Sequence, residues 1–276
     1  MRLIKSIKSK KTLKKVNSIT NKIFNEDCFS TMQKMKQGFC DLVITSPPYN
    51  TSRNNHSERA LKNHEGRYDI FVDSGTHEDY VNWTTKLFNK FDEILVENGV
   101  VLYNLNYGND GNNSTCDNLI DTIHSISTNT NFMVSDIIVW KKSSALPNNT
   151  SKNKCTRIWE FIFVLCRKSE NKTYNSGKKI KSVAKTGQNF YTNMFNFIEA
   201  PNNDGSCKLN KATFSSNLVL QLLDMYAPSK DIVVYDPFIG TGTTAVACKE
   251  FGCKYIGSEL SKAQCEYAIE RIENIE

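Results

Sequence analysis

Residues 231–259 have the sequence DIVVYDPFIGTGTTAVACKEFGCKYIGSE. The run from Asp231 to Tyr235 is rich in β-branched residues and predicts a strand. Thr243 to Glu250 predicts the helix that follows, ended by Gly252, and Lys254 to Gly257 predicts a second strand. Strands that alternate with helices in this way are typical of a parallel, doubly wound α/β sheet. That is the fold class we expect.

The turn between the first strand and the helix has the pattern of a cofactor-binding loop. Gly240 and Gly242 allow the backbone to turn tightly and approach a ligand. Glu259, at the tip of the second strand, can accept hydrogen bonds from both hydroxyls of a ribose. The pattern therefore indicates an adenosine cofactor. A nicotinamide dinucleotide site is the alternative, because residues 240–245 also match G-x-G-x-x-A, but Asp236-Pro237 just before the turn disfavours it.

A second motif follows a strand predicted at Cys40 to Thr45. Ser46-Pro47-Pro48-Tyr49 lies at the carboxyl end of this strand, where open α/β sheets place their ligands. Two prolines remove amide hydrogens, so the Ser46 hydroxyl and the Pro47 carbonyl can act as acceptors for a nucleobase amine. Tyr49 offers a ring face on which the base can stack. The alternative is an ordinary proline turn with a core tyrosine.

The remaining pattern supplies the other elements of one main domain. Thr76 with Asp79 resembles a capping box at the start of a helix that we expect to end at Gly99, and Ser261 with Gln264 caps a last helix. Further strands are expected at 100–105, 134–140 and 158–165, the last two as antiparallel neighbours, and a further helix at 216–227. Residues 50–75 lack periodicity and predict a long loop, and the three tryptophans are expected in the core.

Positive charge gathers in two segments of the chain. The formal net charge is +6, but residues 1–20 carry seven Lys and Arg and no acid, and residues 141–190 carry twelve Lys and Arg against Glu160 and Glu170. A protein that binds a polyanion concentrates charge in this way. We expect a basic N-terminal arm at 1–20 and a domain at 21–276 with a small basic insertion. Solvated lysine runs are the alternative.

Several classes of protein and site are disfavoured. No apolar run reaches the roughly 18 to 20 residues that span a bilayer, and no apolar core with a cleavage site follows the N-terminus. We therefore expect an intracellular protein, cytoplasmic or wherever its polyanion resides, and not a secreted or membrane protein. The nine cysteines form no C-x-x-C pair and the four histidines show no ligand spacing, so reduced thiols and no metal site are expected.

Together, the two motifs resemble those of S-adenosylmethionine-dependent DNA amino methyltransferases. Ser46-Pro47-Pro48-Tyr49 is similar to that family's catalytic signature [D/N/S]-P-P-[Y/F/W], and residues 236–244 are similar to its cofactor loop. The catalytic motif precedes the cofactor motif by about 190 residues, which resembles the permuted β group. The resemblance extends from Ile23 to the C-terminus. It implies a Rossmann-like methyltransferase sheet with a circularly permuted motif order, and it makes residues from about 143 to 210 the candidate target-recognition region.

Three further segments carry the resemblance less completely. Asn25-Glu26-Asp27-Cys28 resembles the family's Gly-Asp-Cys segment, although Glu26 replaces the glycine, and residues 138–142 resemble a family strand. Residues 211–214 match the segment that packs around the methionine moiety of the cofactor. The histidine and prolines that flank that segment in the family are replaced here by Asn210, Lys211 and Ser215.

The resemblance implies the residues of the site. Catalysis is assigned to the motif Ser46, Pro47, Pro48 and Tyr49. Binding of S-adenosylmethionine is assigned to Asp27, Cys28, Thr213, Phe214, Asp236, Pro237, Phe238, Gly240, Gly242, Thr243, Thr244 and Glu259.

The resemblance also implies the reaction. The target base is extruded from double-stranded DNA, because its amine is out of reach inside the duplex. Methyl transfer is direct, since no cysteine lies in the Pro-Cys context of carbon-5 cytosine enzymes. The serine form of the motif favours N4 of cytosine, and N6 of adenine is the alternative. No histidine or carboxylate adjoins residues 46–49 in sequence, so the route of the released proton stays open.

Other functions and partners remain open from the sequence. Methylation of RNA or of a protein amide is disfavoured by the motif order and the basic insertion. A catalytically inactive DNA-binding relative is disfavoured by the intact glycine turn and Glu259. A cognate restriction endonuclease is an expected partner, and the small insertion leaves room for a homodimer. Four basic residues of the loop at 50–75 are expected either to close over DNA or to stay solvated: Arg53, His56, Arg59 and Arg67.

Overall fold

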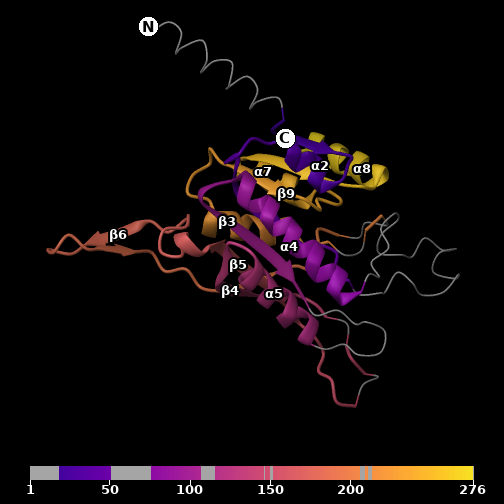
Figure 1. The fold of residues 1–276 in the computed structure, drawn as a ribbon, viewed down its shortest axis with the longest axis horizontal. Coiled ribbons are helices and arrows are strands. Elements are labelled where there is room, and N and C mark those ends of the chain that lie inside the picture. Colours follow the sequence, from indigo (N-terminus) through magenta and orange to yellow (C-terminus); the bar gives the residue numbers. More distant parts are fainter. Residues whose placement is uncertain are drawn as a thin grey trace, which may run out of the picture.

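The computed structural model describes residues 19–50, 76–106, 116–145, 147–149, 152–205, 209, 210 and 213–275. These residues form an eight-stranded sheet with helices on both faces and a separate two-stranded hairpin (Figure 1). The strands of the sheet are β1 (Lys22–Phe24), β2 (Cys40–Thr45), β3 (Leu95–Leu105), β4 (Phe132–Lys142), β5 (Trp159–Arg167), β8 (Phe197–Ala200), β9 (Val233–Asp236) and β10 (Lys254–Ser258). The helices are α2 (Cys28–Gln33), α4 (His77–Ile94), α5 (Asp117–Asn129), the 3-10 turn η2 (Lys168–Glu170), α6 (Ser216–Tyr226), α7 (Thr243–Phe251) and α8 (Lys262–Glu273). The hairpin strands are β6 (Ile180–Val183) and β7 (Asn189–Tyr191).

The sheet has the strand order β1-β10-β9-β2-β3-β5-β4-β8. All neighbouring pairs are parallel except the two that involve β5, which runs against both β3 and β4. The antiparallel pairing expected for residues 134–140 and 158–165 is therefore confirmed. Because parallel neighbours require crossover connections, helices cover both faces of the sheet. The mostly parallel, Rossmann-like α/β fold is as predicted.

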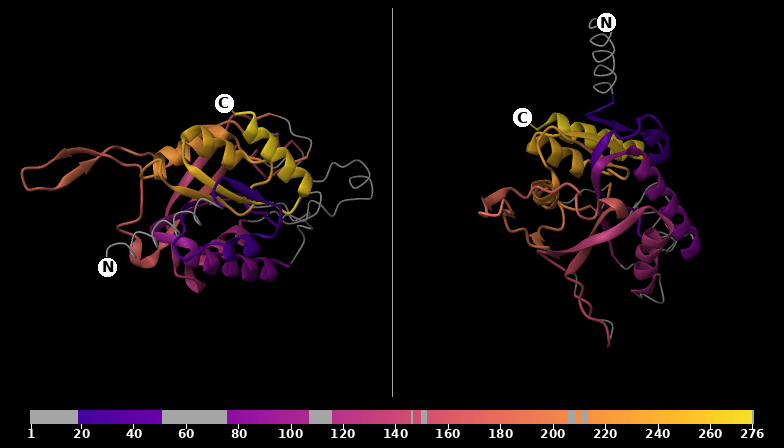
Figure 2. Two further views of the ribbon diagram at one scale, coloured as in Figure 1. Left: turned by 90° about the horizontal axis from the view of Figure 1, so that it is seen from above. Right: turned by 60° about the vertical axis from the view of Figure 1, so that its left-hand side comes forward.

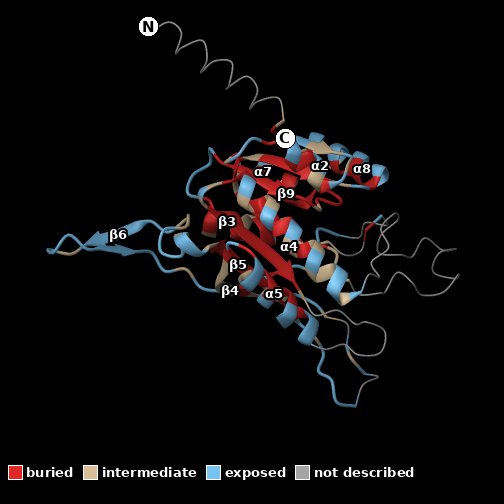
Figure 3. Ribbon diagram, in the orientation of Figure 1, coloured by how far each residue is buried: buried red, intermediate tan, exposed pale blue. Residues whose placement is uncertain are grey.

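The core lies on both faces of the central strands. Val100 and Leu102 of β3 pack on one side, whereas Val101 and Tyr103 pack on the other, and all four are fully buried. Helices α6, α7 and α8 cover the first side, and α2, α4 and α5 cover the second. Figure 3 shows the resulting buried layer of the sheet between partly exposed helices. This double burial explains why residues 100–103 of β3 form a continuous apolar run.

Capping residues define most helix ends as expected. The Thr76 hydroxyl accepts a hydrogen bond from the Asp79 amide (3.1 Å), and the Ser261 hydroxyl accepts one from the Gln264 amide (3.2 Å). Gly252 ends α7 in the left-handed conformation, with φ of 90°. Thr76 and Ser261 are therefore confirmed as helix starts, and Gly252 as a helix end.

The predicted end of α4 at Gly99 is wrong. The helix ends at Ile94, and β3 begins at once with Leu95, which pairs with Cys40 before the register shifts to Leu42 opposite Val100. A Cβ at Gly99 would lie 3.2 Å from the Asp41 carbonyl oxygen of the adjacent strand. This glycine therefore permits close approach of two backbones in an irregular part of the sheet, and it does not terminate the helix.

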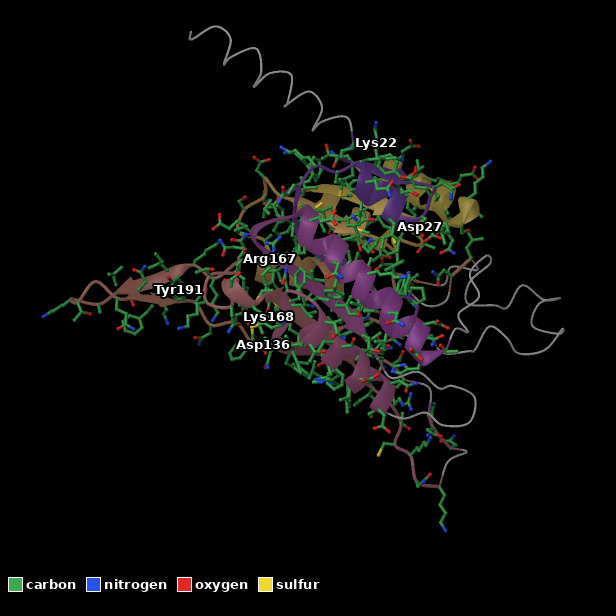
Figure 4. All side chains as sticks on the ribbon, in the orientation of Figure 1. Lys22, Asp27, Asp136, Arg167, Lys168 and Tyr191 are labelled. Atoms are coloured by element: carbon green, nitrogen blue, oxygen red, sulfur yellow. The ribbon has the colours of Figure 1, made fainter. Side chains whose placement is uncertain are left out.

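The range 143–210 contains parts of the sheet as well as irregular segments. It includes β5, as expected, and β8, which was not expected and which pairs with β4 at the edge of the sheet. The hairpin β6–β7 lies outside the sheet and is exposed along both strands. Figure 2 shows it projecting from the body of the molecule, and Figure 4 shows Tyr191 in it on the opposite side from Asp27.

Some expectations lie outside the described residues. These are the basic arm up to residue 18 and the loop residues 51–75, with the four basic side chains named above. Within the described part of the chain, no helix has the length and apolar character required to cross a membrane.

Gly242, at the start of α7, should be sensitive to a single added methyl group. Its φ is +87°, and a Cβ there would lie 2.7 Å from the Ala268 Cβ of α8. We expect Gly242→Ala to lower the free energy of unfolding by about 2–5 kcal/mol, through left-handed strain and overpacking together. Urea denaturation measures the change.

Gly187 offers a matched control for this substitution. It lies in the exposed turn of the hairpin with φ of +85°, and its Cβ would meet no atom within 4 Å. Gly187→Ala should therefore report the strain alone, about 1–2 kcal/mol. Equal losses in the two variants would contradict a packing role for Gly242.

Candidate active site

A cavity of about 290 Å³ lies at the carboxyl ends of the parallel strands. Asp27, Glu259, Pro237 and Ser46 line it, and they follow β1, β10, β9 and β2 directly or within a few residues. Asn104, near the end of β3, completes this row. Carboxyl ends of parallel strands meet at one edge of a sheet, which is where open α/β folds bind ligands.

The cavity brings together most of the residues predicted for the site. The predicted residues that line it are Asp27, Cys28, Ser46, Pro47, Pro48, Tyr49, Thr213, Phe214, Pro237, Phe238, Gly240 and Glu259. The predicted residues that lie behind its wall are Asp236, Gly242, Thr243 and Thr244.

Asp236 connects the two motifs beneath the cavity. Its carboxylate accepts hydrogen bonds from the Thr45 hydroxyl (2.7 Å), the Thr244 hydroxyl (2.6 Å) and the Phe238 amide (3.0 Å). Thr45 immediately precedes the Ser-Pro-Pro-Tyr motif, and Thr244 lies in the first turn of α7. The side chain is 1% exposed and does not line the cavity, so it positions both motifs from below, although the resemblance assigned Asp236 to cofactor binding.

The glycine turn is held by the acid at the tip of β10. Glu259 accepts hydrogen bonds from the Gly240 amide (3.0 Å) and from the Ser261 amide (2.8 Å), one on each carboxylate oxygen. A carboxylate oxygen can accept more than one hydrogen bond, so ligand hydroxyls can share these atoms. Gly240 has φ of +53°, and a Cβ there would lie 3.3 Å from the Asn210 amide nitrogen on the cavity wall.

Aromatic side chains form another part of the wall. Phe238, which follows β9, lies 5.5 Å from Trp83 of α4 between ring centroids, and Trp83 lies 5.8 Å from Tyr80. Trp140 of β4 also lines the cavity although it is 2% exposed. Two tryptophans expected in the core therefore face the site, and flat rings here can hold a flat ligand.

The Ser-Pro-Pro-Tyr motif is embedded in a network of polar side chains. The Tyr49 hydroxyl lies 2.9 Å from the Ser46 hydroxyl and donates to the Glu160 carboxylate (3.3 Å). The Asn104 amide donates to the same carboxylate oxygen (3.1 Å), and Lys142 forms an ion pair with the other oxygen. The network fixes the tyrosine ring from its hydroxyl end. The Glu160 carboxylate therefore contacts the motif in the folded protein, although no carboxylate adjoins residues 46–49 in the sequence.

The backbone of the motif is fixed as well. The Pro48 carbonyl accepts a hydrogen bond from the Tyr80 hydroxyl (2.8 Å) of α4. This hydrogen bond anchors the Pro48 carbonyl to α4. Pro47 also lines the cavity. Its role as an acceptor for a ligand stays a prediction.

The polar residues of the cavity that sequence reasoning missed include Asn104, Lys142 and Glu160. Signals for two of them existed. Asn104 is a polar residue near the tip of an otherwise apolar strand, and Glu160 is one of two acids in a strongly basic segment. Neither signal identifies a partner, because the partners lie on strands distant in sequence.

The cavity offers little for covalent or metal chemistry. Burial raises the pKa of the Cys28 thiol to about 12, so the thiol stays protonated and is a poor nucleophile. Among the residues that the structure describes, no cluster of three or more His, Cys, Asp or Glu side chains could hold a metal ion.

Comparison with known proteins places the chain among DNA-modifying enzymes. A family model described as DNA methylase (N6_N4_Mtase) matches residues 40–270. The orphan methyltransferase M.BamHII of Bacillus amyloliquefaciens is 27% identical over 263 residues, covering 85% of this chain and 89% of that protein.

Solved structures with similar folds carry related names. The PvuII DNA methyltransferase, described as cytosine-N4-specific, superposes with a TM-score of 0.69 at 16% identity, covering 92% of this chain and 87% of that one. The M1.HpyAVI–SAM complex superposes with a TM-score of 0.55 at 20% identity, covering 92% and 99%.

The buried carboxyl of Asp236 should make stability depend on pH. Burial raises its pKa from 3.8 to about 6, against the lowering effect of its three hydrogen bonds. Because the pKa is higher in the folded state, the protonated Asp236 side chain stabilises the fold at a pH below the pKa of the unfolded state. This contribution is lost as the pH rises through 6. Relative to Asp236→Asn, the wild-type free energy of unfolding should fall by about 2 kcal/mol between pH 4 and pH 7.

Urea denaturation of both proteins across this range measures the difference. Asp231→Asn is the matched control, because Lys254 lowers the pKa of that surface carboxyl and no such fall is expected. A difference between wild type and Asp236→Asn that stays constant from pH 4 to pH 7 would contradict the titration.

Proposed function

Because the chain belongs to the N6_N4_Mtase family of DNA methylases, we propose that it methylates the exocyclic N4 amino group of cytosine in double-stranded DNA. It is an S-adenosylmethionine-dependent DNA amino methyltransferase. The choice of cytosine, the permuted motif order and the roles of individual residues are our proposal. One observation carries the proposed transfer from cofactor to base: the glycine turn with Glu259 and the Ser-Pro-Pro-Tyr motif line the same cavity.

The residues of the cavity fit S-adenosylmethionine. When bound, this cofactor supplies an electrophilic methyl group on a sulfonium centre. Glu259 is suited to its ribose hydroxyls and Asp27 to the edge of its adenine, since a carboxylate accepts strong hydrogen bonds. Thr213 and Phe214 line the part of the cavity proposed for the methionine moiety.

The Ser-Pro-Pro-Tyr motif is suited to an extruded base. The Ser46 hydroxyl and the Pro47 carbonyl would accept the hydrogens of the amine and orient its nitrogen lone pair. Tyr49 would stack on the base, with its ring held by Ser46 and Glu160. Catalysis then rests on positioning and on acceptors directed at the charge that develops on the amine.

Cytosine is favoured by the residue that begins the motif. In DNA amino methyltransferases, serine at this position accompanies N4-cytosine more often than aspartate does, and Ser46 occupies it here. The PvuII enzyme, cytosine-N4-specific by its name, shares the fold. N6-adenine remains the alternative base.

Target recognition is assigned to the segment between β4 and β5. Lys142 and Glu160, at the ends of these strands, line the cavity, so residues 143–158 begin and end at its rim. This segment carries Lys152, Lys154 and Arg157, whose charges complement DNA phosphates. The hairpin β6–β7 comes after the end of β5 in the chain. It projects beyond the opposite end of the strands (Figure 1). A cognate endonuclease and a homodimer stay predictions.

Glu259 should be required for cofactor binding. Glu259→Gln replaces one charged acceptor with a donor, so affinity for S-adenosylmethionine should fall by at least about tenfold. Isothermal titration calorimetry measures this change. Glu266→Gln, at an exposed position of α8, is the matched control and should bind as wild type does. Equal affinity in the two variants would remove Glu259 from the cofactor site.

The base assignment is tested in DNA from cells that express the protein. Mass spectrometry of nucleosides should detect N4-methylcytosine, and Ser46→Ala or Tyr49→Ala should lower it at least about tenfold, because each removes a group that positions the amine. Ser182→Ala and Tyr191→Ala, in the exposed hairpin, are matched controls. Detection of N6-methyladenine alone would overturn cytosine and keep the enzyme class.

A further inference from the structure

Asn104 lies where the catalytic motif and the reversed strand β5 meet. Its strand β3 lies between β2, with Tyr103 opposite Thr45, and β5, with Asn104 opposite Ile162. The side chain is 5% exposed and lines the cavity together with Ser46 and Glu160. An uncharged amide is therefore buried at the edge of the space proposed for the target amine.

The orientation of this amide follows from its neighbours. Glu160 forms an ion pair with Lys142, and a carboxylate accepts hydrogen bonds but does not donate them. The Asn104 nitrogen must therefore face Glu160, from which it lies 3.1 Å, and it lies 3.5 Å from the Ser46 hydroxyl oxygen. Both neighbours take the nitrogen side of the amide, so the Oδ1 oxygen faces away from them.

This oxygen has no partner among the residues that the structure describes. Three buried side-chain oxygens share this condition: Thr84 Oγ1, Tyr103 OH and Asn104 Oδ1. Of these three residues, only Asn104 lines the cavity. A buried acceptor without a donor is unfavourable, and a ligand that brings a hydrogen to the cavity removes the penalty.

We propose that Asn104 Oδ1 accepts a hydrogen bond from the amino group of the target base. Glu160 and Lys142 are positioning residues that hold the amide in this orientation. The inference rests on the proposed function and adds an acceptor to Ser46 and Pro47. An exocyclic amine donates two hydrogens, so one hydrogen is shared between two of the three acceptors Ser46, Pro47 and Asn104, and together they can fix the plane of the amine and direct its lone pair.

Three variants and one control test the proposal. Asn104→Leu removes the acceptor and keeps the number and branching of the side-chain heavy atoms, and Asn104→Asp places a second carboxylate against Glu160. The double variant Asn104→Asp with Glu160→Gln restores a donor facing an acceptor, because the introduced glutamine amide can donate to the introduced aspartate carboxylate. It preserves the net charge beside Lys142 and keeps an oxygen at the position of Asn104 Oδ1. Thr84→Val is the control, because it removes an unpartnered buried oxygen away from the cavity.

The readouts are kcat with radiolabelled S-adenosylmethionine on DNA from an unmethylated host, calorimetric cofactor affinity and melting temperature. We expect Asn104→Leu to lower kcat by at least about thirtyfold while cofactor affinity changes less than about threefold. Asn104→Asp should lose a similar factor, the double variant should recover to within about tenfold of wild type, and Thr84→Val should match wild type.

Two results would overturn the proposal. Wild-type kcat in Asn104→Leu would show that the oxygen does not touch the amine, and a double variant no better than Asn104→Asp would remove the positioning role of Glu160. These outcomes are distinct from failure of the proposed function, in which wild type itself methylates no DNA and both proposals fall. The double variant keeps the test valid if Asn104→Leu does not fold.

Discussion

The buried carboxylate of Asp236 holds together the two halves of the site. Strand β2 pairs with β9 in parallel, Leu42 opposite Val234 and Val43 opposite Tyr235, so Thr45 and Asp236 arrive at the same edge of the sheet. The hydrogen bond from Thr45 then connects segments 191 residues apart in the chain. Any displacement of this pair would separate the proposed acceptors for the base from the loop proposed to hold the cofactor. The raised pKa of Asp236 reflects the cost of burying a carboxyl for that purpose.

The polar network at the catalytic edge has a similar physical logic. Glu160 is nearly buried, and its charge is balanced by Lys142 and by hydrogen bonds from Tyr49 and Asn104. Removal of one partner would leave a buried charge or donor unsatisfied, so the members of such a network hold one another in place. Rigidity of this kind is what a transfer reaction needs, because its rate depends on the alignment of donor and acceptor atoms.

The single reversed strand determines what lies at each edge of the sheet. Because β5 runs against its neighbours, its start brings Glu160 to the cavity and its end, at Arg167, lies at the opposite edge. The basic residues between 141 and 190 are thereby divided into those that precede β5, on the side of the cavity, and those that follow from Arg167 onward, at the opposite end of the strand. Basic residues that belong to one segment of the sequence therefore lie on two separate parts of the surface.

Local chemistry determined much of this protein from its sequence. The strands, the caps at Thr76 and Ser261 and the glycine turn depend on neighbouring residues, and the Ser-Pro-Pro-Tyr motif carries its acceptors within four consecutive positions. Only the tertiary structure revealed Asn104, Lys142 and Glu160, the supporting role of Asp236 and the backbone contact that explains Gly99. The physical reason is strand register. It sets which side chains meet across 56 to 191 residues of chain, and no local pattern encodes that pairing.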